Sequence, residues 1–133
     1  MRPKVNNKVI LDASALLAII QEEVGSEVIK PLLKLSVMSA VNVTEALSVL
    51  QRTNITPAEG LSLITDIISS ILPFDLEQAE QAAKLHPLVQ SKGLSLADRA
   101  CIALGIQLHL PIYTADKVWA ELQLNGAEIK LIR

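Results

Sequence analysis

The sequence predicts an α/β fold built on a parallel sheet with helices on both faces. Short apolar runs alternate with amphipathic stretches along its 133 residues, and no linker, repeat or low-complexity tract divides them. Strands that alternate with helices favour parallel pairing through right-handed crossovers. Half of the residues are hydrophobic, which is enough for a real core and too many for a disordered chain. We therefore expect one domain over residues 1–133.

The short apolar runs are the predicted strands. They are residues 9–11, 35–38, 71–74, 111–113 and 129–131. Pro73 has no N–H to give to a neighbouring strand, so the third run fits only an edge or terminal position.

The amphipathic stretches between these runs are the predicted helices. They are residues 13–22, 26–34, 39–52, a helix opened by Thr56, residues 75–90, a helix opened by Ser95, and residues 116–124. Thr56 and Glu59 match a capping box with Pro57 at the first helical position. Pro31 must kink the second helix or limit its start. The apolar stripe expected after Thr56 is Leu61, Ile64, Ile68 and Ile71, and the one after Ser95 is Ala97, Ala100, Cys101, Leu104 and Leu108.

The composition excludes several classes of protein. Fourteen acidic and 12 basic residues give a net charge of −2, unlike a protein that binds nucleic acid mainly through phosphates. Only three residues are aromatic, which argues against a base-stacking platform. The single cysteine rules out an intrachain disulfide and a multi-cysteine metal site, and suits a reducing cytoplasm. The longest uncharged run, residues 100–115, is too short to span a membrane, so we expect a cytoplasmic protein.

Four carboxylates lie just after predicted strands or in the first two turns of predicted helices. Asp12 comes directly after the first strand, and Asp116 comes shortly after the fourth. Glu45 lies in the second turn of the helix after the second strand, and Asp98 lies in the first turn of the helix opened by Ser95. Because ligands bind outside the carboxyl ends of parallel strands, we expect these side chains to meet at one edge of the sheet.

Each acid also has a purely structural interpretation. Asp12 and Asp116 are placed to cap helices, and Asp98 is placed to complete a capping box with Ser95. Glu45 is too deep in its helix to cap anything. A glutamate in that position is more often solvated, but it needs a partner if it is buried.

The four acids together point to a metal site. Four carboxylates that meet at one edge of the sheet would repel one another. Such a cluster is stable only when it is protonated or holds a cation. Oxygen ligands without cysteine or paired histidine favour Mg²⁺ or Mn²⁺. A divalent ion with open positions is suited to phosphodiester hydrolysis. Ser14, Asn42 and Thr114 are close enough in sequence to orient ligands or water around it.

At these residues the sequence resembles the PIN-domain ribonucleases, and among them the VapC-type toxins of toxin–antitoxin pairs. The matching segments are residues 9–16, 39–47, 94–104 and 112–119. The resemblance implies a three-layer α/β/α sandwich with a parallel sheet of about five strands. It implies that Asp12, Glu45, Asp98 and Asp116 form an acidic quartet, with Asp12 and Asp98 as direct metal ligands. It also implies metal-dependent cleavage of RNA, a homodimer, and inhibition by a small antitoxin protein.

Other functions have less support. A non-catalytic protein-binding module would have no reason to keep four mutually repelling acids. A phosphoacceptor domain needs paired acids after the first strand, whereas Ala13 and Ser14 follow Asp12 here. Histidine or cysteine catalysis is disfavoured because His86 and His109 are not paired and Cys101 lies on an apolar stripe. Arg99, beside Asp98, is interpreted either as a contact to RNA phosphate or a partner chain, or as a solvated surface residue.

Overall fold

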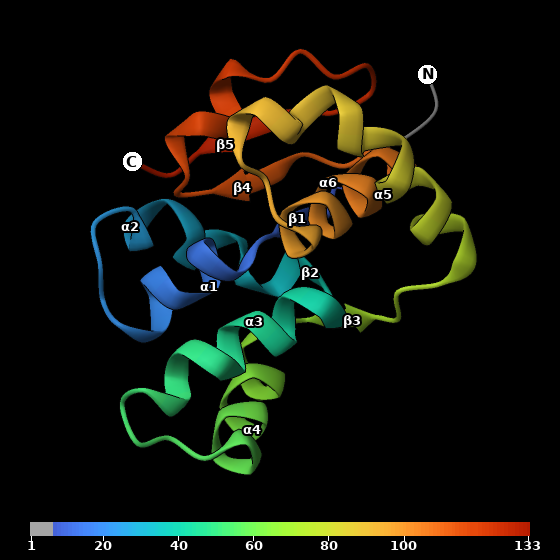
Figure 1. Ribbon diagram of the computed structural model, residues 1–133. Helices are drawn as coiled ribbons and strands as arrows, with labels where there is room; N and C mark the ends of the chain where they lie inside the picture. The colour runs from blue at the N-terminus through green and yellow to red at the C-terminus, as the bar shows by residue number, and fades with distance from the viewer. Residues whose placement is uncertain (1–6) are drawn as a thin grey trace.

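The computed structural model describes residues 7–133 and contains a five-stranded parallel sheet. Its strands are β1 (Val9–Leu11), β2 (Ser36–Ser39), β3 (Ser70–Leu72), β4 (Ile112–Thr114) and β5 (Ile129–Leu131). They lie in the order β3-β2-β1-β4-β5, and every neighbouring pair is parallel (Figure 1). The predicted α/β class and sheet are confirmed. Pro73 follows β3, which is an edge strand as the proline requires.

Helices cover both faces of this sheet. They are α1 (Ala13–Ile20), α2 (Ser26–Ile29), α3 (Ala40–Gln51), α4 (Pro57–Ile67), α5 (Leu76–Val89) and α6 (Leu96–Leu108), with 3-10 segments η1 (Lys30–Leu35), η2 (Gln90–Lys92) and η3 (Lys117–Glu121). Figure 1 shows α1, α3 and α4 on one side of the strands and α5 with α6 on the other. Within residues 7–133, no helix combines the length and hydropathy needed to cross a bilayer.

The two faces of the sheet have separate cores because side chains alternate along each strand. Val9 and Leu11 of β1 pack with α1, α3 and α4, whereas Ile10 packs with α5 and α6. In β2, Met38 packs in the same core as Val9 and Leu11, and Val37 packs in the same core as Ile10. The strand β1 lies at the centre of the sheet and is covered on both faces. This position explains why its sequence is a continuous apolar run.

The predicted helix caps are present. Glu59 N donates to Thr56 Oγ1 at 3.1 Å, and Thr56 N donates to Glu59 Oε1 at 3.0 Å. Asp75 Oδ1 accepts from Gln78 N at 2.8 Å and so starts α5. These local hydrogen bonds satisfy N–H groups that have no partner inside the helix.

Several predicted boundaries are wrong. The helix expected over 26–34 changes to 3-10 geometry at Lys30, next to Pro31, and the helix expected over 116–124 is the short 3-10 segment η3. The helix over 13–22 ends at Ile20, and β2 begins one residue later than predicted. The stripe after Thr56 is also only partly correct. Ile64 and Ile68 are buried, whereas Leu61 is 45% exposed and Ile71 belongs to β3.

Gly105 is where α6 comes closest to β4. A Cβ at this position would overlap Cγ1 and Cδ1 of the fully buried Ile112. We expect Gly105→Ala to lower the free energy of unfolding by about 1–3 kcal/mol because the core has no room for it. Gly60→Ala is the matched control, since the one close contact of its Cβ would be the tip of the half-buried Leu47 side chain at 2.7 Å, with Leu50 and Ile55 at ordinary contact distances. Urea denaturation of both variants measures the difference, and an undiminished Gly105→Ala protein would contradict this packing.

Candidate active site

The four predicted carboxylates line one cavity at the carboxyl edge of the sheet. This cavity has a volume of about 300 Å³. Its lining residues are Asp12, Ala13, Ser14, Leu17, Glu45, Val49, Asp98 and Asp116. The strands β1 and β4 are neighbours, so the residues that follow them lie side by side although they are about a hundred positions apart in sequence. The helices α3 and α6 bring Glu45 and Asp98 to the same place.

Asp12 is the most deeply placed of the four acids. Its side chain is 4% exposed. Oδ1 accepts hydrogen bonds from Ser14 Oγ at 2.7 Å and from Ala15 N at 2.9 Å. Oδ2 accepts from Thr114 Oγ1 at 2.6 Å. Asp12 is therefore the N-cap of α1 and a wall of the cavity at once.

Ser14 and Thr114 connect Asp12 to the segment that carries Asp116. Ser14 Oγ accepts from Ala115 N at 2.9 Å, and Thr114 Oγ1 accepts from Asp116 N at 3.0 Å. The Asp116 carboxylate in turn accepts from Val118 N at 3.0 Å and starts η3. The two hydroxyl groups thus hold both acids in a fixed relation to the ends of β1 and β4.

Asp98 completes a capping box at the start of α6. Its Oδ2 accepts from Ser95 N at 3.0 Å, and its own N–H donates to Ser95 Oγ at 3.1 Å. Glu45 lies half-buried on α3. One turn before it, Asn42 Nδ2 donates to the Ala97 carbonyl oxygen of α6 at 3.0 Å. This bond ties together the two helices that carry Glu45 and Asp98.

The acids disfavour one another's charge. Burial is the main cause that raises the pKa of Asp12 to about 6, and repulsion from Asp98 adds to it, against the hydrogen bonds from Thr114, Ser14 and Ala15. Burial and then Asp98 raise the pKa of Glu45. Burial raises the pKa of Asp98, with a smaller contribution from Asp116. None of the described residues lining the cavity is basic, so no side chain there offsets this repulsion.

The expected convergence is looser than a formed metal site. Among residues 7–133, no three acidic, histidine or cysteine side chains are close enough together to hold one metal ion. Asp12, Asp98 and Asp116 each direct one oxygen to a backbone N–H group at a helix start. The chemistry of the four acids nevertheless fits a hard divalent cation, because the side chains that they offer are all carboxylates. No basic side chain lines the cavity to balance their negative charge, so a cation would supply the missing positive charge.

Other residues considered from the sequence have structural roles. Arg99 Nη1 donates to the Ala82 carbonyl oxygen of α5 at 3.1 Å, so the guanidinium joins two helices rather than facing the cavity. Cys101 is fully buried, and burial is the main cause that raises the pKa of its thiol, as expected of a core residue. His86 and His109 are exposed and do not line the cavity.

Leu17 and Val49 form an apolar part of the cavity that sequence reasoning missed. Leu17 lies one turn after Ser14 on α1, and Val49 lies one turn after Glu45 on α3. Residues three or four apart share a helix face, so this spacing was a usable signal.

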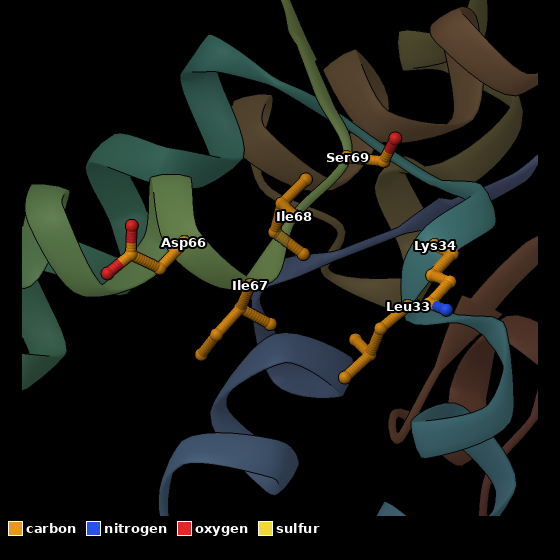
Figure 2. Close-up of a pocket in the computed structure, with 6 residues that line it drawn as sticks. All are labelled: Leu33, Lys34, Asp66, Ile67, Ile68 and Ser69. Carbon is orange, nitrogen blue, oxygen red and sulfur yellow. The ribbon is translucent and has the colours of Figure 1, made fainter.

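A larger cavity, of about 490 Å³, lies away from the acids. Figure 2 shows Leu33 and Lys34 on one side of it and the segment from Asp66 to Ser69 on the other. These residues precede β2 and β3, so the cavity is at the amino edge of the sheet. It has a single carboxylate, and the carboxyl edge is therefore the better candidate for chemistry.

Comparisons with known proteins give the same fold. The PIN domain family model matches residues 9–124. Among solved structures, DNA-bound VapBC from Salmonella typhimurium aligns with a TM-score of 0.70 and 16% identity, over 95% of this chain and 98% of that chain. VapBC2 from Rickettsia felis, bound to a promoter DNA fragment, aligns with 0.72 and 12%, over 92% and 97%. VapBC-5 from Mycobacterium tuberculosis aligns with 0.58 and 22%, over 96% and 98%. No curated protein matches the sequence.

The raised pKa of Asp12 predicts how stability depends on pH. The folded chain keeps this proton up to about pH 6, whereas the unfolded chain loses it near the ordinary value of 3.8. The folded state then binds more protons, so its stability falls as pH rises from about 4 to about 6, by on the order of 3 kcal/mol. In Asp12→Asn this part of the decline is expected to disappear.

Urea denaturation in the presence of chelator, at half-unit steps from pH 4.5 to pH 7, measures this dependence. Asp75→Asn is the matched control, because Asp75 also caps a helix but lies outside the cavity. An equal pH dependence in wild type and Asp12→Asn would show that Asp12 is ionised normally.

Proposed function

We propose, from the premise that this chain belongs to the PIN domain family, that it is a metal-dependent endoribonuclease and the VapC-type toxin of a toxin–antitoxin pair. The observation that carries the proposal is the convergence of Asp12, Glu45, Asp98 and Asp116 on one cavity without a basic residue in its lining. The expected PIN family and fold are confirmed, and the specific activity is our inference from the site.

The proposed site residues have distinct places in the cavity. Asp12 is the buried acid of the cavity, Glu45 and Asp98 are half-buried, and Asp116 is exposed. We assign Asp12 and Asp98 as direct ligands of Mg²⁺ or Mn²⁺, with Glu45 and Asp116 completing the site. When bound, the divalent ion supplies Lewis acidity that activates water and offsets charge on the phosphate oxygens.

The chain itself contributes positioning and charge. Ser14 and Thr114 donate to opposite oxygens of Asp12, which fixes the plane of its carboxylate. Burial is the main cause that raises the pKa of Asp12, Glu45 and Asp98, and repulsion from a neighbouring acid adds to it. A bound cation would offset both effects by stabilising the ionised carboxylates, so the site favours binding one. Glu45 and Asp116 are then placed to hold or accept a proton from water at the mouth of the cavity.

Partner proteins are also part of the proposal. VapBC-5 is a member of the VapBC family of toxin–antitoxin systems, and the other two structures named above are VapBC assemblies bound to DNA. This similarity supports a cognate antitoxin as partner of this chain. A homodimer would cover apolar surface as well. Large side chains that the described part of the chain leaves exposed are Val24, Val28, Leu61, Leu63, Leu76, Leu88, Leu96 and Leu131. RNA as substrate is proposed from the family resemblance, and the cytoplasm as location is proposed from the single cysteine and the short uncharged run.

A non-catalytic binding module is the second candidate. The observation that favours it is that, within residues 7–133, no three potential ligands are gathered at metal-binding distance. Such a module would bind an antitoxin-like partner without binding Mn²⁺ or cutting RNA.

RNA cleavage by the purified protein tests the proposed activity. We expect cleavage that chelator abolishes and added Mn²⁺ restores. Asp12→Asn and Asp98→Asn are each expected to lose at least about 100-fold in rate, because each removes a charge that would hold the ion. Asp75→Asn is expected to keep full activity, since it alters a cap outside the cavity. Chelator-resistant cleavage, or full activity in both site variants, would rule out this mechanism.

Calorimetry with Mn²⁺ separates the two candidates without an activity assay. The nuclease proposal predicts binding by wild type and at least about tenfold weaker binding by Asp98→Asn. Circular dichroism spectra of both proteins control for folding. Wild-type protein that releases or absorbs no heat with Mn²⁺ at several temperatures would favour the non-catalytic module.

A further inference from the structure

We infer that Asn42 is a positioning residue of this site, whose side-chain amide holds α3, with Glu45, at a fixed distance from the start of α6, with Asp98. This inference rests on the proposed function, because it assigns Asn42 a role in binding the same divalent ion.

The contact that carries the inference joins distant parts of the chain. Asn42 is 0% exposed, and its Nδ2 donates to the Ala97 carbonyl oxygen at 3.0 Å. Ala97 directly precedes Asp98 in the first turn of α6. The bond therefore fixes the backbone of α6 next to the residue that carries one of the proposed ligands.

The same amide faces the other ligand-bearing helix. Glu45 lies three residues after Asn42, so the two side chains share one face of α3. A carbonyl oxygen only accepts hydrogen bonds, so the NH₂ group must point toward Ala97. Its second hydrogen is available to the Glu45 carboxylate, and the neighbouring Asn42 amide does lower the pKa of Glu45.

Stability alone does not explain an asparagine at this position. Asn42 Oδ1 is buried, and the residues described by the structure give it no hydrogen-bond partner. An unpaired buried acceptor destabilises the folded state, and an apolar residue of similar shape would avoid that cost. The donated bond between the two helices is the compensating feature.

Repulsion gives that bond its function. Glu45 and Asp98 are like-charged acids on different helices that line the same cavity, so they repel each other. Without a tie, the helices can relieve the repulsion by moving apart, which would separate two proposed ligands of one ion. Residues that orient metal ligands typically change metal affinity by 10–100-fold when they are removed.

Mn²⁺ affinity, measured by calorimetry on the full chain, tests the role of Asn42. We expect Asn42→Ala to raise the Kd for Mn²⁺ at least about tenfold. Gln78→Ala is the matched control. Gln78 is a buried amide too, with Nε2 donating to the Pro73 carbonyl at 3.2 Å and an unpaired Oε1, but it lies on α5 away from the acids. It is expected to lose comparable stability with no change in Kd.

A double-mutant cycle shows whether Asn42 acts through Glu45. In the Glu45→Gln background, Asn42→Ala is expected to change the Kd by a smaller factor than in the wild type, because only Asp98 is left for the Asn42 amide to position. If Asn42→Ala does not fold, Asn42→Ser and Gln78→Ser replace the pair, since serine leaves a smaller cavity and cannot bridge both helices.

The outcomes distinguish this inference from the proposed function. Wild-type protein without Mn²⁺ binding overturns both. Wild type that binds Mn²⁺ while Asn42→Ala binds equally well overturns only the role of Asn42. Equal weakening in Asn42→Ala and Gln78→Ala would also overturn it, because loss of stability would then account for the effect.

Discussion

The burial of the Asp12 carboxylate is the constraint on which the rest of the site depends. Removing an ionised carboxylate from water is unfavourable unless hydrogen bonds or a counter-charge compensate. Here Ser14, Ala15 and Thr114 donate to it, yet its pKa still rises to about 6, with burial as the main cause. The ends of β1 and β4 are thus held around a group that is stabilised further by a proton or a cation.

Capping and site formation have the same structural origin. In a parallel sheet, the helix starts gather at the edge where the strands end. Asp12, Asp98 and Asp116 each cap a helix or a 3-10 segment, and all three line the same cavity. The structural and functional interpretations of these acids were posed as alternatives from the sequence. The fold shows that one position can cap a helix start and line the cavity at once, so the structural interpretation of these acids does not compete with the proposed functional one.

The sequence predicted most of what depends on local signals and sheet topology. The cap at Thr56, the edge position of β3 and the gathering of four acids at one edge follow from residue type and connectivity. The 3-10 geometry of η3 and the direction of Arg99 toward α5 depend on packing between distant segments, which no local pattern encodes. The directions of the carboxylate oxygens could not be predicted either, because each oxygen can point to a backbone N–H group or into the cavity.

That choice does not exclude ion binding, because a carboxylate has two oxygens with more acceptor capacity than one cap uses. Asp98 uses Oδ2 for Ser95 N, and Asp116 uses Oδ1 for Val118 N. Within residues 7–133, their other oxygens accept no backbone N–H group. A cation can therefore draw these oxygens inward without breaking either helix start. The caps hold the carboxylates near one another, and the charge of the ion supplies the attraction that four like-charged side chains lack.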